Sequence, residues 1–179
     1  MTDILLVSLG STAGLRAADA ELAASLRRAG AAVVEAAVDL PPERPSFVLH
    51  DLAQARAARR AAERAVAEER PRAILYSTVT AALLWPEPGA IRFDAPAAGN
   101  RRGRHGLWQR PRERRRLAEA PLLVPWSTGA LSETPSPHAD AVVVPVPVEP
   151  ADGPAQARDL AAVTYAADAP KKGLDRVLA

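Results

Sequence analysis

The chain has 179 residues, of which 48% are hydrophobic and 25% charged, and its formal net charge is +2. This balance is that of a folded globular protein, and it excludes collagen-like and wholly disordered chains. The chain contains no cysteine, which excludes disulfides and thiolate metal sites. No apolar run approaches the roughly 18 residues of a membrane span, and the first residues lack the basic start of a signal peptide, so we expect a cytoplasmic protein.

Short apolar runs alternate along the chain with longer segments rich in Ala, Leu and Arg. In chain order, the predicted elements are a strand at Ile4–Ser8, a helix at Ala17–Ala29, a strand at Ala32–Val38, a helix at Ser46–Glu69, a strand at Ala73–Ser77, a helix at Thr78–Leu84, a strand at Ala90–Phe93, a helix at Pro111–Ala120, a strand at Leu122–Val124, a helical turn at Thr128–Glu133 and a strand at Ala141–Val146. Repetition of strand, helix and strand predicts an α/β fold: a Rossmann-like, doubly wound parallel sheet in three layers, α/β/α.

The composition changes near residue 149. Residues 149–154 are rich in Pro, Asp and Gly, which favours a linker over residues 149–161. Residues 162–179 contain a short apolar run and the start of a helix, with no further strand to pair with. We therefore expect one domain over residues 1–148, a linker over 149–161, and the truncated start of a second domain over 162–179.

The first turn between strand and helix runs from Ser8 to Gly14 and contains two glycines. Glycine lets the backbone approach a ligand closely, and amides at a helix start can hold an anion. The spacing is not G-x-G-x-x-G, and no Gly-Lys-Ser/Thr follows, so neither the dinucleotide fingerprint nor a P-loop is present. A tight turn without a ligand is the alternative interpretation.

Polar side chains follow the fourth predicted strand. Asp94 ends that strand, and Asn100, Arg101 and His105 lie in the glycine-containing loop after it. Functional side chains in parallel sheets emerge at the carboxyl ends of strands, so this loop is a candidate cleft wall, with a solvent loop as the alternative. Trp108 is interpreted as an apolar anchor of the loop.

Two other polar features favour structural roles. Ser127 lies in Pro125-Trp126-Ser127-Thr128-Gly129, which does not fit the G-x-S-x-G nucleophile elbow, so a helix N-cap is expected. The three histidines are scattered and no metal-binding spacing occurs, so we expect no metal.

Eight arginines crowd one segment of the chain: Arg101, Arg102, Arg104, Arg110, Arg112, Arg114, Arg115 and Arg116. Such a run can meet phosphates or acidic lipid headgroups, although a solvated face is the commoner explanation. The near absence of interleaved aromatic residues argues against nucleic acid as a partner.

Several segments together resemble the GT-B glycosyltransferases of the group 1, family 4-like type. Ile4–Gly10 resembles their first strand and glycine turn, and Arg92-Phe93-Asp94 resembles their aromatic-Asp segment. Residues 113–127 resemble the stretch E-x-x-L-x-x-A-D-x-V-x-x-x-S, and Lys172-Gly173-Leu174-Asp175 resembles the opening of the donor-binding domain.

The resemblance implies the amino-terminal half of an enzyme that transfers a sugar from a nucleotide-sugar donor to an acceptor, with no metal or other cofactor. It implies that Gly10, Ser11 and Lys172 contact the donor. Asp94, Asn100, Arg101 and His105 would line the acceptor side, while no residue that carries the chemistry is identified. The implied partners are a sugar, a lipid-linked molecule or another small molecule as acceptor, and the membrane surface as a peripheral contact.

The sequence departs from the family where it has Ala166-Ala167, because the family has an arginine there that neutralises the donor diphosphate. This departure favours the alternative, a non-catalytic Rossmann-like domain that binds a ligand or regulates another protein. In either case the fragment alone is expected to be inactive. An exposed tail also predicts self-association through residues 162–179.

Overall fold

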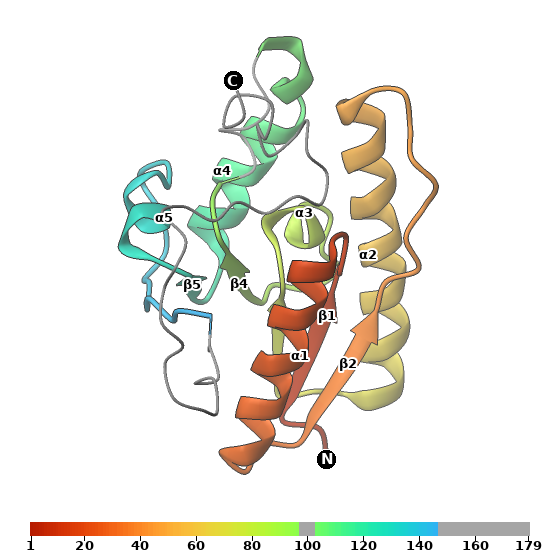
Figure 1. The fold of residues 1–179 in the computed structure, drawn as a ribbon, viewed down its shortest axis with the longest axis vertical. Helices are drawn as coiled ribbons and strands as arrows, with labels where there is room; N and C mark the ends of the chain where they lie inside the picture. Colours follow the sequence, from red (N-terminus) through yellow and green to blue (C-terminus); the bar gives the residue numbers. More distant parts are fainter. Residues whose placement is uncertain (97–102, 147–179) are drawn as a thin grey trace, which may run out of the picture. The chain divides into compact units, whose positions relative to one another are not determined.

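The computed structural model describes residues 1–96 and 103–146, leaving aside the side chains of Arg104 and His105. Its centre is a five-stranded sheet with the order β2-β1-β3-β4-β5 (Figure 1), in which every pairing is parallel. The strands are β1 (Ile4–Ser8), β2 (Val33–Ala37), β3 (Ala73–Tyr76), β4 (Ala90–Phe93) and β5 (Leu123–Pro125). The predicted α/β class is therefore confirmed.

Helices connect the strands, and four of them begin at a capping hydroxyl. The helices are α1 (Ala13–Arg28), α2 (Phe47–Glu69), α3 (Val79–Ala82), the 3₁₀ helix η2 (Gly103–Gly106), α4 (Gln109–Glu119) and α5 (Thr128–Ser132). Thr12, Ser46, Thr78 and Ser127 each accept a hydrogen bond from the backbone amide three residues later. These bonds satisfy amide groups that a helix start otherwise leaves without a partner.

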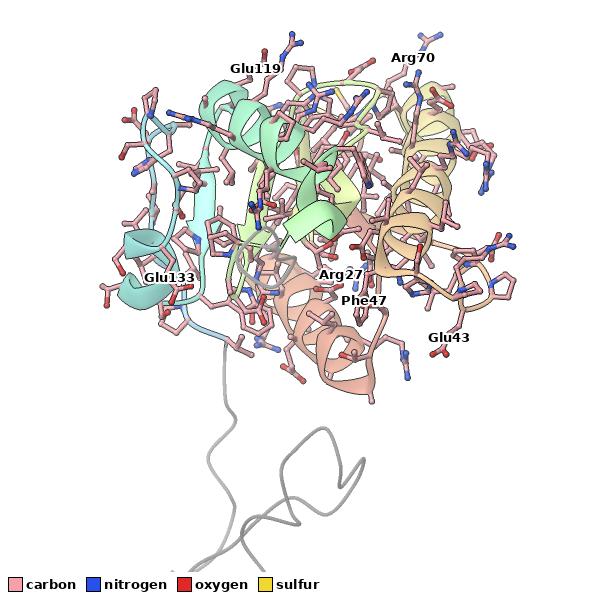
Figure 2. The ribbon with its side chains drawn as sticks, turned by 90° about the horizontal axis from the view of Figure 1, so that it is seen from above. Arg27, Glu43, Phe47, Arg70, Glu119 and Glu133 are labelled. Atoms are coloured by element: carbon pink, nitrogen blue, oxygen red, sulfur yellow. The ribbon has the colours of Figure 1, made fainter. Side chains whose placement is uncertain are left out.

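The helices lie on both faces of the sheet. On one face, α1 packs Leu22 and Ala23 against Leu6 of β1 and Val33 of β2. On the other face, α2, α3 and α4 enclose the larger core, which includes Ala58, Ala82 and Leu117. Figure 2 shows α1 on one side of the strands and α2 and α4 on the other. The expected three layers are thus present.

The first helix begins earlier than predicted. The sequence predicts a turn from Ser8 to Gly14 and a helix from Ala17, whereas α1 starts at Ala13. The reason is Thr12, whose hydroxyl accepts from the amide of Leu15 at 3.2 Å and caps the helix. Gly14 consequently lies inside the first helical turn.

The predicted strand Ala141–Val146 does not form as a regular strand. The segment runs parallel to β5, with Val142 N donating to Leu123 O at 2.9 Å and Val144 N donating to Pro125 O at 3.0 Å. Only the single bridge between Leu123 and Ala141 has ladder geometry. Pro125 has no N–H to donate back, so the ladder loses the bond that would continue it. The predicted linker and second domain lie outside the described residues.

Candidate functional site at the carboxyl edge of the sheet

The carboxyl ends of all five strands meet along one edge, at the top of Figure 1. β2 and β3 lie on opposite sides of β1, so the direction in which successive strands are added across the sheet reverses between β1 and β3. In open parallel sheets, ligands bind outside the carboxyl ends of strands at such a point. The loops that follow β1, β3 and β4 therefore define the candidate site.

The loop after β1 is held in place by the loop after β3. Leu9 N donates to the Ser77 hydroxyl oxygen at 3.1 Å. Gly10 has a φ of 54°, in the left-handed region that favours glycine, and its carbonyl accepts from the Arg16 guanidinium at 2.9 Å. A methyl group at Gly10 would lie 2.9 Å from Arg16 Cγ. These hydrogen bonds hold the glycine turn in one conformation beside the site.

Two hollows adjoin at this edge. The first, which we call the polar hollow, has a volume of about 160 Å³, and its polar wall residues are Ser11, Asp51, Gln54, Thr78, Thr80 and Asp94. The second, the apolar hollow, has a volume of about 440 Å³ and is lined mainly by Gly14, Leu15, Ala17, Ala18, Trp126 and Val146. Leu15 and Asp94 belong to both walls, so the two hollows are neighbours across these side chains.

Asp94 lies where the sequence analysis expects it, directly after β4. Its side chain is exposed, and one carboxylate oxygen accepts from the amide of Ala95 at 2.8 Å. This short-range bond orients the carboxylate at the junction of the two hollows. An oriented carboxylate at that position can accept a proton or a hydrogen bond from a ligand hydroxyl.

Buried polar groups on α2 form the floor of the polar hollow. Asp51 is 2% exposed and Gln54 is 7% exposed. Gln109 Nε2 donates to Asp51 Oδ2 at 2.9 Å, and His50 Nε2 lies 3.1 Å from Gln54 Nε2. The sequence analysis did not select these residues, although polar side chains on the apolar face of a predicted helix are a signal that could have found them.

A second buried network lies under the α1 face of the same edge. Arg92 of β4 is fully buried, and its Nη1 is 3.5 Å from Asp19 Oδ1 of α1. The Ser8 hydroxyl donates to Asp19 Oδ2 at 2.6 Å, and the Arg92 guanidinium carbon lies 4.6 Å from the centre of the Trp126 ring. This network joins β1, β4 and the loop after β5 beneath the apolar hollow.

Burial has the largest effect on the pKa values of Asp19 and Arg92. It raises the pKa of the Asp19 carboxyl, although hydrogen bonds from Ser8 and Ser77 and the charge of Arg92 act in the opposite direction. Burial also lowers the pKa of the Arg92 guanidinium, opposed by Asp19. Sequence reasoning missed the pair because its members are 73 residues apart.

The remaining predicted site residues have different outcomes. Gly10 and Ser11 lie at the carboxyl edge with Asp94, and Ser11 lines the polar hollow. His105 belongs to η2, while Asn100, Arg101 and Lys172 lie outside the described residues.

Two structural assignments made from the sequence are confirmed. The Ser127 hydroxyl caps α5, accepting from Ala130 N at 3.0 Å. Trp108 packs against the main core.

The arginines of α4 are largely engaged by the protein itself. Arg115 Nε and Arg116 Nη1 lie 2.7 and 3.1 Å from carboxylate oxygens of Glu119. Arg116 also stacks on Trp85, with 4.7 Å from its guanidinium carbon to the ring centre, and Arg114 donates to Ser136 O at 2.8 Å. These contacts leave Arg112 beside them in a basic surface hollow of about 300 Å³. Part of the arginine run is therefore paired with groups of the protein itself.

Within the described residues, no cluster of three His, Cys, Asp or Glu side chains has the geometry of a metal site. No helix among residues 1–96 and 103–146 is both long and apolar enough to cross a membrane. No family model, curated protein or solved structure matches the chain.

Proposed function

We propose that this chain is the acceptor-side half of a glycosyltransferase that moves a sugar from a nucleotide-sugar donor to an acceptor hydroxyl. The observation that carries the proposal is Asp94, a carboxylate at the carboxyl edge of a parallel sheet with a ligand-sized hollow on either side. The parallel α/β fold is compatible with the GT-B architecture that the sequence resembles. The order of the motifs along the chain supports the same class.

The roles of the residues follow from the chemistry of the transfer. An acceptor hydroxyl beside Asp94 would donate a hydrogen bond to its carboxylate, which orients the attacking oxygen. The departing nucleotide diphosphate carries negative charge, and its stabilisation is the main electrostatic demand of the reaction. Gly10, Ser11 and Lys172 are proposed for the donor side, with Asn100, Arg101 and His105 beside the acceptor. The sugar nucleotide is a co-substrate, and the proposal includes no metal.

Peripheral membrane contact is part of this proposal. Phe47 and Leu49 of α2 are 60% and 54% exposed, and Leu107 is 73% exposed. The bond from Gln109 to Asp51 joins the segments that carry these side chains, so the apolar groups belong to one region of the molecule. Apolar side chains beside the arginines of α4 suit an anionic lipid surface that presents a lipid-linked acceptor.

The test uses the full-length gene product and a panel of uridine, guanosine and adenosine diphosphate sugars. Binding is measured by calorimetry and turnover by release of the nucleoside diphosphate. Lys172→Ala should abolish donor binding, whereas Lys171→Ala, its sequence neighbour, should retain it. Absence of binding for every nucleotide sugar would refute the transferase proposal.

The competing function is a non-catalytic ligand-binding or regulatory domain. The sequence Ala166-Ala167, where the resemblance expects an arginine, favours it. A full-length protein that binds a small ligand at the carboxyl edge without releasing nucleotide from any donor would establish this second function.

A further inference from the structure

The polar hollow has the chemistry of a site for a neutral polyhydroxylated group. Its polar wall consists of two carboxylates, one carboxamide and three hydroxyls, and none of the described residues lining it is basic. Such a wall offers more acceptors than donors, so it matches a ligand rich in O–H donors and opposes a phosphate or carboxylate.

Part of the polar wall is buried and hydrogen-bonded within the protein. Asp51 and Gln54 are more than nine-tenths buried, yet both border the hollow. The Thr80 hydroxyl, half-buried in the same wall, makes no hydrogen bond with any residue that the structure describes. The Thr80 hydroxyl can therefore bond a ligand hydroxyl without giving up a hydrogen bond inside the described part of the protein.

The size of the polar hollow limits what enters it. At about 160 Å³, the hollow is smaller than the roughly 300 Å³ at which pockets for drug-sized ligands begin, which suits a group the size of one sugar ring better than a whole nucleotide. Phe93, Val79 and Leu15 complete the wall with apolar surface, which suits the C–H faces of such a ring.

The apolar hollow continues from the same point. It is larger, at about 440 Å³, and the Trp126 ring forms part of its wall. Because Leu15 and Asp94 line both hollows, a ligand lying across Asp94 has a polar site on one side and an apolar site on the other.

We propose that the acceptor is amphiphilic: a neutral sugar or similar polyol occupies the polar hollow, and the apolar body attached to it occupies the apolar hollow beside Trp126. This inference rests on the proposed function, which supplies the term acceptor, and it moves Ser11, which lines the polar hollow, from the donor side to the acceptor side. The binding itself requires neither a donor nor turnover, and Asp94 at the junction lies beside the hydroxyl that would be modified.

The experiment measures binding of octyl glucoside, octyl galactoside and octyl mannoside to the 179-residue chain, below their micelle concentrations, by calorimetry and saturation-transfer NMR. Free hexoses, octanol and a hexose phosphate are the comparison ligands. At least one octyl glycoside should bind more tightly than both its free sugar and octanol. The hexose phosphate should bind more weakly than the neutral hexose.

Two variants, each with a matched control, locate the two parts of the ligand. Thr80→Val removes a hydroxyl from the polar hollow at nearly constant shape and should weaken octyl glycoside binding about three- to tenfold. Thr128→Val, an exposed threonine outside both hollows, should leave it unchanged. Ala17→Phe fills the apolar hollow from an exposed helix position and should weaken binding about tenfold or more, because the octyl chain loses its contact surface. Ala20→Phe, exposed on the same helix but outside the hollow, is its control.

Each outcome decides the proposal. Equal binding of octanol and the octyl glycosides, no effect of Thr80→Val, or preference for the hexose phosphate would overturn it, as would no octyl glycoside binding at all. These results leave the nucleotide-sugar test untouched, so failure of this inference is distinguishable from failure of the transferase proposal.

Discussion

Gly89 precedes β4 and passes so close to β3 that no side chain fits there. A methyl group at this position would lie 2.6 Å from the Ile74 carbonyl oxygen and 2.9 Å from both Ile74 Cβ and Tyr76 Cε2. Gly89→Ala should therefore destabilise the protein by about 3 kcal/mol, at the upper end of the usual cost of overpacking. This loss should lower the melting temperature by about 6–12 °C in a chain of this length.

The loop cannot relieve the clash by moving away. The Tyr76 hydroxyl donates to the carbonyl of Glu87 at 2.8 Å, and the Tyr76 ring lies 5.7 Å from that of Trp85. Burial raises the pKa of the Tyr76 hydroxyl, so it is a neutral donor at all ordinary pH values. Displacing the loop would break this bond and leave a buried hydroxyl without a partner, which itself costs about 1–3 kcal/mol.

Urea denaturation followed by circular dichroism measures the effect, and Gly14→Ala is the matched control. A methyl group at Gly14 meets no atom within 4 Å, and the residue lies in the first turn of α1. The same substitution there should stabilise the protein by about 0.5 kcal/mol, because alanine loses less backbone entropy than glycine. A Gly89→Ala protein within about 0.5 kcal/mol of the wild type, a change typical of an unconstrained surface site, would refute the reasoning.

Three further variants test the packing of the site and the ends of the elements. Burial outweighs attraction in the Asp19–Arg92 pair. The double variant Asp19→Leu/Arg92→Met should therefore be as stable as the wild type, or up to about 4 kcal/mol more stable, by thermal denaturation. A loss of stability above about 1 kcal/mol would contradict this. Ser127→Ala should cost about 1 kcal/mol in urea through loss of the α5 cap, and an unchanged midpoint would show that the cap contributes nothing. The hydrogen bond from Ala32 N lowers the pKa of Asp3, so its contribution to stability is present above 3.8 and is lost as the pH falls below that value. Asp3→Asn should accordingly lose less stability than the wild type on acidification below 3.8, and equal acid sensitivity would refute this assignment.

The sequence predicted elements whose cause is local. The run Ile4–Ser8 forms a strand with the predicted bounds, as does Ala90–Phe93. Ser127 caps the helix that follows it, and α1 ends at Arg28, one residue before the predicted end, with Gly30 at a φ of 91° just beyond. Apolar periodicity, capping and the left-handed preference of glycine each act within a few residues, so one sequence is enough to read them.

Two predictions were wrong: the start of α1 and the strand Ala141–Val146. The start of α1 was placed too late because two glycines outweighed the capping hydroxyl of Thr12. The predicted strand Ala141–Val146 is not regular because Pro125, the last residue of β5, has no N–H to donate to this neighbouring segment. A missing N–H affects the partner chain segment as well as its own, and the partner is known only once the sheet is formed.

Tertiary structure alone decided what surrounds the candidate site. The sequence placed Asp94 at the end of a strand, but the two hollows beside it arise from α1, α2, α3 and the loop after β5. Gln109 meets Asp51 across 58 residues, and Arg92 meets Asp19 across 73. Such contacts depend on strand order and helix packing rather than on local propensity, because side chains distant in the chain become neighbours only when the sheet has its order. The sequence by itself therefore determined which groups stand at the edge of the sheet, and the fold determined which of them share a wall.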